Sequence, residues 1–356
     1  MRKNKKTVKI AVAVIIFCLL YIILAFRRMS TELHLSPEWS VDISNQDSVS
    51  QSEETIPYRL GQNIGYFTED GRIASRIPYP FKATISESYY ASYGTDNTST
   101  EFYRADGTPA GTISEQGFPF FDGSRLYVFL PGGNAFASYT TTGNAEQLWK
   151  YESYAPITAF ATSSGGVVAG LADGTIVSFD HGGRQIHRFA PGGSSIPVIL
   201  GADISEDGKT VACVSGQNQQ RFVVAQKTDD GHSKIIFHEY LDRDFNSQVL
   251  VKFGGDGKTV YYNYNGGLGI ANLETLSSRH VPLEGQIVQI EEATDSWLVV
   301  VLSRKGKTYT VTVIEPENHP VAEFSFDADC AFIQTRGDRL FLGRDSKISC
   351  MTLSRK

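Results

Sequence analysis

The chain has 356 residues, of which 41% are hydrophobic and 20% are charged, so it can build a packed core and bulk disorder is excluded. Its first 28 residues hold seven basic residues and no acidic one, which leaves 33 − 7 = 26 basic against 39 acidic residues, a formal charge of −13, for the rest. A body that acidic repels nucleic acid and anionic lipid, so we expect no nucleic-acid partner.

The first predicted element is a transmembrane signal-anchor helix at residues 10–28, after a basic tail at residues 1–9. Ile10 to Phe26 is apolar and uncharged, and as a helix it spans roughly 26 Å, close to the thickness of a bilayer core. The alternative is a cleaved signal peptide, whose apolar core is about 7–15 residues long and ends at a small-x-small site that this run lacks. The basic flank places the N-terminus in the cytoplasm. The sequence therefore predicts a single-pass protein of the cytoplasmic (inner) membrane with an extracytoplasmic, periplasmic body after Arg28.

Residues 29–59, rich in Ser, Glu, Gln and Asp, are predicted to form a polar stalk. From residue 60 to residue 356 we expect an all-β domain. Runs of four to eight residues rich in Val, Tyr, Phe, Ile and Thr, such as Arg125–Leu130 and Thr308–Ile314, are separated by turn residues. No window in this part shows the sustained helical spacing of apolar residues.

The turns recur with a period of about forty residues, the length of one four-stranded β-propeller blade. The count favours a propeller of seven blades and leaves six or eight open. It also predicts that an N-terminal strand within Asn63–Ile77 completes the last blade and closes the ring. The turns expected after the first strand of each blade lie near Glu87, Asp122, Ser164, Asp207, Asp256, Asp295 and Gly337.

The pentapeptide Asp-Gly-Lys-Thr-Val occurs twice, at Asp207–Val211 and Asp256–Val260. Gly-Lys-Thr ends a phosphate-binding P-loop, but that motif needs a Gly five residues earlier and a helix afterwards. Asp203 and Lys252 hold the earlier positions, and β-branched or aromatic residues follow each copy. We therefore predict no nucleotide binding, and interpret both copies as hairpin turns at equivalent places in adjacent blades.

These repeats resemble known propeller families. "ADISEDGKTVACVS" and "VKFGGDGKTVYYNY" are similar to the Asp-Gly-Lys repeat of WD-like propellers of the TolB type. "GNAEQLWKYE", with Trp149, resembles the quinoprotein-like repeat of bacterial outer-membrane assembly lipoproteins. The resemblance implies a β-propeller and a role in envelope assembly. A quinone cofactor of that fold implies a vicinal cysteine pair, which the chain lacks, so no cofactor is predicted.

The search for a chemical site assigns no catalytic residue and no metal. Asp242, Asp244 and Asn246 have the spacing of a calcium loop, but the Gly and Glu that such a loop needs further on are absent. Cys330 and Cys350 leave one disulfide open as an alternative. Paired carboxylates from different blades are invisible in one sequence, so a propeller-fold hydrolase, glycosidase or peptidase-like, stays the alternative function.

The remaining interpretation is a protein-binding scaffold or docking platform held outside a membrane. In a propeller, the loops that enter each first strand share a face with those between the second and third strands, and this face is the usual binding surface of the fold. Aromatic and arginine side chains form interface hot spots. The residues predicted to bind a partner in or beside these loops are Phe118, Tyr154, Gln217, Arg221, Arg243 and Phe245.

Overall fold

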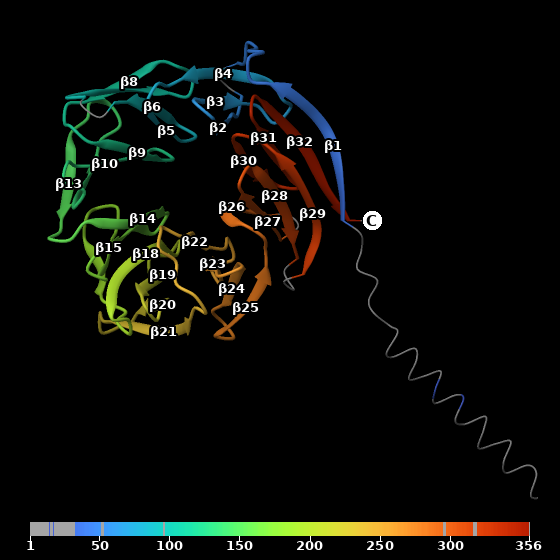
Figure 1. The fold of residues 1–356 in the computed structure, drawn as a ribbon. Coiled ribbons are helices and arrows are strands. Elements are labelled where there is room, and N and C mark those ends of the chain that lie inside the picture. The colour runs from blue at the N-terminus through green and yellow to red at the C-terminus, as the bar shows by residue number, and fades with distance from the viewer. Residues whose placement is uncertain are drawn as a thin grey trace, which may run out of the picture.

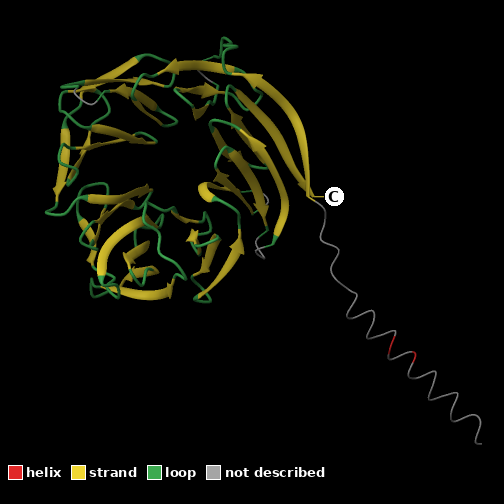
Figure 2. Cartoon of the chain, viewed as in Figure 1, coloured by secondary structure: helices red, strands yellow, loops and turns green. Residues whose placement is uncertain are grey.

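The computed structural model describes Val14, Phe17 and residues 33–50, 53–94, 97–294, 297–315 and 319–355. From residue 33 onward, the described residues form eight β-sheets, arranged as a ring around a central opening (Figure 1). Strands and the turns that join them make up the whole ring (Figure 2). Each sheet is one blade, and the blades are numbered here from the sheet of β2 to the sheet that contains both ends of the ring.

Blades 1 to 4 follow one another along the chain. In order, they contain β2 (Ile56–Leu60), β3 (Asn63–Phe67) and β4 (Ile73–Pro78); β5 (Lys82–Ile85), β6 (Tyr89–Tyr93), β7 (Thr100–Arg104) and β8 (Pro109–Ile113); β9 (Phe118–Asp122), β10 (Arg125–Phe129), β11 (Ala135–Tyr139) and β13 (Gln147–Glu152); and β14 (Ile157–Ser163), β15 (Gly166–Leu171), β16 (Ile176–Phe179) and β17 (Gln185–Phe189). The short β12 (Gly143–Asn144) leaves blade 3 and pairs in parallel with β8 of blade 2.

Blades 5 to 8 complete the ring. They contain β18 (Ile196–Ile204), β19 (Thr210–Gln217), β20 (Arg221–Lys227) and β21 (Ser233–Tyr240); β22 (Val251–Phe253), β23 (Thr259–Tyr264), β24 (Gly267–Asn272) and β25 (Ser277–Pro282); β26 (Gln286–Ala293), β27 (Leu298–Lys305), β28 (Thr308–Ile314) and β29 (Pro320–Asp327); and β30 (Ala331–Arg336), β31 (Arg339–Arg344), β32 (Lys347–Arg355) and β1 (Leu33–Asp42).

The first strands of blades 2 to 8 lie innermost, where they contact one another round the opening. Because neighbouring strands are antiparallel, the loops into each first strand share one face with the loops between second and third strands. We call this the upper face, and the opposite face, with the other two sets of turns, the lower face. Asn134, in a loop of the second kind, donates a hydrogen bond of 2.7 Å to Ser153 O in a loop of the first kind.

The ring is closed by a strand from the segment predicted to be a stalk. β1 pairs antiparallel with β32, from Leu33 opposite Arg355 to Asp42 opposite Lys347. The prediction that a strand within Asn63–Ile77 completes the last blade is wrong, because that stretch forms β3 and β4 of blade 1. β1 is held by its apolar face: Trp39 and Val41 pack on the core beside β32, and Trp39 Nε1 donates to Glu69 O at 3.1 Å.

The preference for seven blades is also wrong, since the described residues form eight. Blade 1 has three strands, and its innermost strand β2 contacts β5 and β30, the innermost strands on either side. Its turn at Gly61 lies on the upper face, beside the loop into β5 and beside Cys330, so β2 runs opposite to the first strands of the other blades and blade 1 has no strand equivalent to them. The turn between β3 and β4, at Asp70, precedes the equivalent turn of blade 2, at Asp106, by 106 − 70 = 36 residues, so the blade follows the period but lacks the first strand by which the blades were counted.

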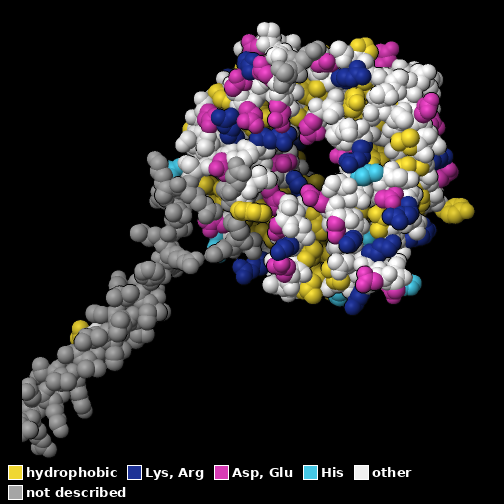
Figure 3. Space-filling view, turned by 180° about the vertical axis from the view of Figure 1, so that it is seen from behind, with side chains coloured by type: hydrophobic (Ala, Val, Ile, Leu, Met, Phe, Trp, Pro, Cys, Tyr) yellow, Lys and Arg dark blue, Asp and Glu magenta, His cyan; other side chains and the backbone are white. Residues whose placement is uncertain are grey.

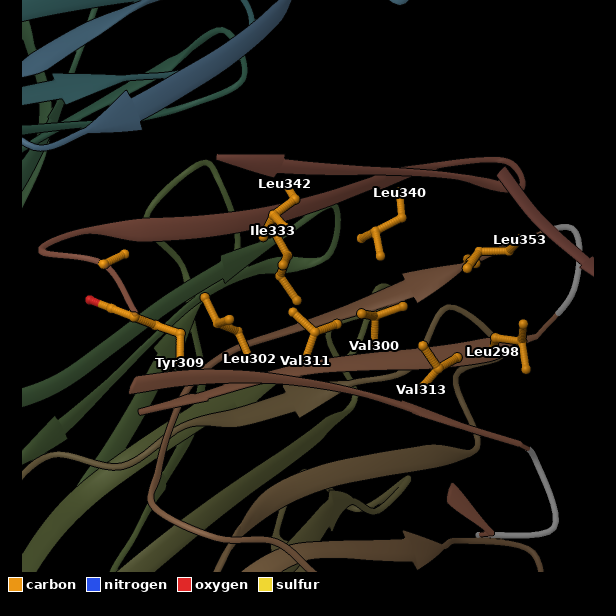
Figure 4. Close-up of a cluster of buried hydrophobic side chains, with 12 residues drawn as sticks. Leu298, Val300, Leu302, Tyr309, Val311, Val313, Ile333, Leu340, Leu342 and Leu353 are labelled. Carbon is orange, nitrogen blue, oxygen red and sulfur yellow. The ribbon is translucent and has the colours of Figure 1, made fainter. Parts of the chain in front are cut away.

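The core lies between neighbouring blades, where the two facing sheets interlock apolar side chains. Between blades 7 and 8, Leu298, Val300 and Leu302 alternate along β27 and pack toward Ile333 and Leu340 (Figure 4). The alternate residues Val299 and Val301 pack on the opposite side, in the core between blades 6 and 7, so both faces of β27 are buried. Each such fully buried side chain contributes about 1.5–3 kcal/mol to folding.

Both Asp-Gly-Lys-Thr-Val copies form hairpin turns, as predicted. The first joins β18 to β19 and the second joins β22 to β23, at equivalent places in blades 5 and 6. Gly208 has φ 70° and Gly257 has φ 64°, the left-handed conformation that favours glycine. A strand follows each turn, so neither copy has the helix N-terminus of a P-loop.

Two further predictions concern cysteines and the membrane. Cys330 and Cys350 are both free thiols, so the alternative of a disulfide between them is excluded. The predicted transmembrane helix at residues 10–28 lies outside the described residues except for Val14 and Phe17, which are helical and exposed. Within the described part of the chain, no helix has the length and apolar character needed to span a membrane.

Candidate functional site in the central channel

The inner strands are fastened to one another by side chains that bond to the main chain of the next blade. Asp203 of β18 accepts a hydrogen bond from Phe253 N at 2.7 Å, and Lys252 of β22 donates to Ile290 O at 2.8 Å. Gln289 of β26 donates to Ile333 O at 2.6 Å and accepts from Ile333 N at 3.0 Å. These bonds are paired and partly buried, so they hold the channel wall of blades 5 to 8 in one geometry.

Two adjoining hollows are set into this wall between blades 4 and 7. One has a volume of about 400 Å³ and the other of about 470 Å³, and Leu250, Val251 and Val288 line both. The first hollow is lined further by Phe160, Gln248 and other residues of the inner strands. Gln248 Nε2 donates to Thr158 O at 2.7 Å, so the loop into blade 6 reaches across blade 5 to blade 4. Together, the hollows reach the size of small-ligand or peptide side-chain pockets.

The second hollow is lined by three charged residues, Asp203 and Glu206 of blade 5 and Lys252 of blade 6. Burial raises the pKa of Asp203 from 3.8 to about 6, although two backbone N–H groups and Lys252 favour its ionised form. The side chain is partly exposed to the hollow, but the surrounding protein removes most of its water. Lys252 Nζ lies 3.5 Å from Glu291 as well. A carboxyl group with a pKa of about 6, beside a lysine and a second carboxylate, can hold or exchange a proton there.

The channel wall is apolar beside this charged group. In β9, an innermost strand, the residues alternate between exposed and buried, and Phe118 and Phe120 are the exposed ones. Phe120 packs edge-on against Phe160 at 5.7 Å between ring centroids. Leu250 and Val288 are exposed on the wall of the hollows. A large exposed apolar surface is typical of a binding site.

Three of the six predicted partner-binding residues lie on the surface. Phe118 is 45% exposed and Tyr154, in the loop from blade 3 to blade 4, is fully exposed. Arg243, in the loop from blade 5 to blade 6, is exposed as well. Phe118 lies at the upper end of β9, and the other two belong to loops of the upper face. The structure therefore brings these three residues to the face on which they were expected.

The other three predicted residues take part in the structure of blade 5 and its neighbour. Arg221 is only 8% exposed, and its guanidinium donates to Pro191 O and Gly192 O at 2.5 and 2.6 Å. Phe245 is half-buried on the core between blades 5 and 6. The carbonyl group of Gln217 accepts a hydrogen bond from Ser194. The burial of Arg221 and Phe245 corrects the expectation that both are displayed to a partner.

Sequence reasoning missed Phe120, Leu250, Val288 and the charged group at Asp203. A sequence-level sign exists for Asp203, because a carboxylate inside the apolar strand Ile196–Ile204 needs a partner. The apolar residues carry no such sign, since their exposure depends on lying innermost in the ring. Among the described residues, no group of three or more metal-ligating side chains occurs. Of the residues with calcium-loop spacing, Asp242 accepts a hydrogen bond from Tyr264 at 2.6 Å and Asp244 accepts one from Gln220 N.

Figure 3 shows one face of the ring, hollowed at its centre, with acidic and basic side chains interspersed around the hollow. Ion pairs on the lower face, such as Arg336 with Glu87 and Arg339 with Glu69, join blade 8 to blades 1 and 2. They are solvent-exposed, so each contributes at most about 1 kcal/mol. The mixture of signs argues against steering by a single kind of charge.

Comparisons of the sequence and the structure with known proteins agree with the ring of eight blades in being those of a β-propeller. A protein-family profile described as "beta-propeller protein" matches residues 1–355. An uncharacterized protein of Treponema pallidum (strain Nichols) is 31% identical over 316 residues, which is 88% of this chain and 82% of the relative. Among solved structures, BamB from Moraxella catarrhalis has a TM-score of 0.61 and Saccharomyces cerevisiae Sqt1 one of 0.65. Each is 11% identical and covers 90% of this chain and 100% of its own, so the likeness concerns the fold.

Proposed function

The chain belongs to a family of β-propeller proteins, and we propose that it is a protein-binding scaffold that docks a partner on its upper face. The observation that carries this proposal is the group of exposed apolar side chains on the channel wall and its upper rim, Phe118, Phe120 and Tyr154. Exposed aromatic rings beside a rigid pocket are the side chains that supply most of the affinity in protein interfaces. The paired inner strands hold them in place before a partner arrives, which reduces the entropy lost on binding.

The proposal includes a membrane anchor. The apolar run Ile10–Phe26 and the basic flank before it support an N-terminal helix that tethers the ring outside the cytoplasmic membrane. The resemblance of the repeats to those of outer-membrane assembly lipoproteins supports a partner in envelope assembly. A reporter enzyme that is active only outside the cytoplasm, fused after Lys356, tests the orientation. Activity of a cytoplasm-specific reporter at that position would contradict it, and an intact mass that includes residues 1–28 distinguishes an anchor from a cleaved signal.

Photo-crosslinking tests the docking surface. A crosslinking amino acid at position 118 or 154 should capture the same partner, whereas one at Trp297, on the lower face, should not. The combined change Phe118→Ala, Phe120→Ala and Tyr154→Ala should leave the ring folded, because these rings are exposed, and reduce partner recovery about tenfold or more. Equal capture from positions 118 and 297, or unchanged recovery by the folded triple variant, would place the docking surface elsewhere.

The second candidate is a hydrolase, and one observation favours it. The raised pKa of Asp203 gives a carboxylic acid that keeps its proton near pH 6, as a general acid requires, with Glu291 near the same lysine. Asp203→Asn would abolish hydrolysis of glycoside or peptide substrates if this candidate is right. The same change leaves the exposed upper rim intact, so a scaffold keeps its partner.

A further inference from the structure

Trp297 has a backbone conformation that its side chain does not favour. The first turn of a blade has a glycine with positive φ in blades 3, 5, 6 and 8: Gly123, Gly208, Gly257 and Gly337. In the corresponding turn of blade 7, the described residue with positive φ is Trp297, at 57°. For a bulky residue this conformation is strained, and strain that persists is a reason to look for a function.

No packing contact among the described residues offsets this strain. The Trp297 side chain is 60% exposed, and its ring stacks on no other described aromatic ring. Its indole N–H has no hydrogen-bond partner among the described residues. By contrast, Trp39 and Trp149 are both partly buried and both donate to a backbone carbonyl. Trp297 is thus the tryptophan whose exposed face is available to a ligand.

The ring borders a hollow of about 390 Å³ on the lower face, between blades 6 and 7. Its lining also includes Asn272, Thr275, Ser277 and Arg279. Within the part of the chain that the structure describes, the Asn272 amide N–H₂ and the Arg279 guanidinium donate no hydrogen bond. These groups can therefore donate to a ligand, next to the flat face of the indole.

Two of the three carboxylates that line the same hollow, Glu292 and Asp256, already accept hydrogen bonds from the protein. Glu292 accepts hydrogen bonds from Gly255 N at 2.6 Å and from Tyr261 Oη at 2.7 Å. Asp256 accepts from Lys258 N and Thr259 N, each at 2.8 Å. These bonds leave the two carboxylates fewer lone pairs for a ligand, and a cationic ligand would also meet the charge of Arg279. The groups that remain suit a ligand rich in acceptor oxygens.

We propose that the hollow at Trp297 is a saccharide-binding site. One face of a sugar ring carries C–H groups that can lie on the indole, and its hydroxyl and ring oxygens can accept from Asn272 and Arg279. The hollow has the size of a small-ligand pocket, for which about 300 Å³ or more is typical. The site is separate from the upper-face docking surface, and either proposal can fail without the other.

Tryptophan fluorescence tests the site with three defined tetrasaccharides: maltotetraose, chitotetraose and tetragalacturonate. At least one should change the emission saturably in the intact protein, and the change should vanish in Trp297→Gly. Arg279→Ala should weaken binding of the acidic sugar about tenfold if its carboxylates bind there, and less for the neutral sugars. Tyr154→Ala is the matched control, because it removes an exposed aromatic ring from the opposite face and should bind as the parent does.

Stability of the same variant tests the strain independently of any sugar. Trp297→Gly should fold and raise the melting temperature by about 2 °C, because glycine removes the left-handed penalty and loses little packing. A lower melting temperature would overturn the strain argument, since the side chain would then be structural. No saturable change with any of the three sugars at millimolar concentrations, or saturation by tetramethylammonium instead, would overturn the saccharide assignment.

Discussion

The two Asp-Gly-Lys-Thr-Val turns permit a matched experiment on how blades pack. Gly208 and Gly257 have the same sequence neighbours and similar φ values, and the N–H of each donates to the residue three positions earlier at 2.9 Å. Their surroundings differ. A Cβ on Gly208 would lie 2.6 Å from Gly165 O of blade 4, whereas a Cβ on Gly257 would have no atom within 4 Å.

Alanine at each position separates the two effects. Gly257→Ala adds the cost of the left-handed conformation alone, about 1 kcal/mol. Gly208→Ala adds the same cost and must also push the backbone of the neighbouring turn away, which brings a further ~1–3 kcal/mol. We therefore expect Gly208→Ala to lower the free energy of unfolding by about 2–4 kcal/mol, and by clearly more than Gly257→Ala.

Urea unfolding followed by tryptophan fluorescence measures both changes at one pH. The comparison is valid if both variants keep the slope of the parent, since a changed slope means that blades unfold separately. Equal losses, within about 0.5 kcal/mol, would refute the argument that blade contact distinguishes the turns. Lys209→Ala and Lys258→Ala serve as controls: the exposed pair of Lys258 with Glu274 contributes under about 1 kcal/mol, and nucleotide should protect neither parent nor variants.

Three more predictions can be checked by the same unfolding measurements. Burial lowers the pKa of His187 from 6.5, so the unfolded chain binds the proton at a higher pH than the folded protein does. The free energy of unfolding should therefore fall as the pH drops below about 6.5. His187→Gln should reduce this loss, whereas the control His232→Gln, at an exposed site, should not. The pKa of Asp203 is shifted upward, so its protonated form stabilises the fold at low pH, and this contribution is lost as the pH rises from 3.8 through about 6. The free energy of unfolding of Asp203→Asn should therefore rise relative to that of the parent by up to about 3 kcal/mol between pH 4 and 7. Gln219 has φ 73° in the turn between β19 and β20, and Gln219→Gly should stabilise the chain by about 0.5–1 kcal/mol; a loss would show that its side chain matters.

The repeating part of the fold was predictable because its determinants are local. Asp207 and Gly208 specify a tight turn whatever surrounds them, and the same chemistry recurs in the other first-strand turns. β1 was not predictable in this way, because as an outer strand its residues, Leu33–Asp42, are half-buried or exposed and include Ser, Glu and Asp. Its place depends on β32, more than 300 residues away, and no local pattern encodes that pairing.

The same distinction between local and long-range determinants applies to the residues of the candidate site. Exposure of Phe118 and Tyr154 followed from their position at turns. Arg221 also lies beside a turn, yet the loop that leads into β18 folds over it and supplies the carbonyl groups that it binds. The channel group around Asp203 joins residues from three blades, so it exists only in the assembled ring.

The closure of blade 8 pairs the first described strand of the chain with the last, so β1 lacks its partner until synthesis is nearly complete. During synthesis, β1 emerges before any other strand of the ring, but its hydrogen-bonding partner β32 ends at Arg355. Until then the growing domain is an open arc with a free strand edge at each end, and such edges invite pairing with other chains. A chain that stops some ten residues early lacks the ladder that joins its two ends, although nearly every blade is complete. If residues 10–28 hold the N-terminus in a membrane, β1 is also the strand through which tension on the tether reaches the ring. The closing ladder runs along its whole length, from Leu33 to Asp42, so a pull along the strand axis loads many hydrogen bonds together.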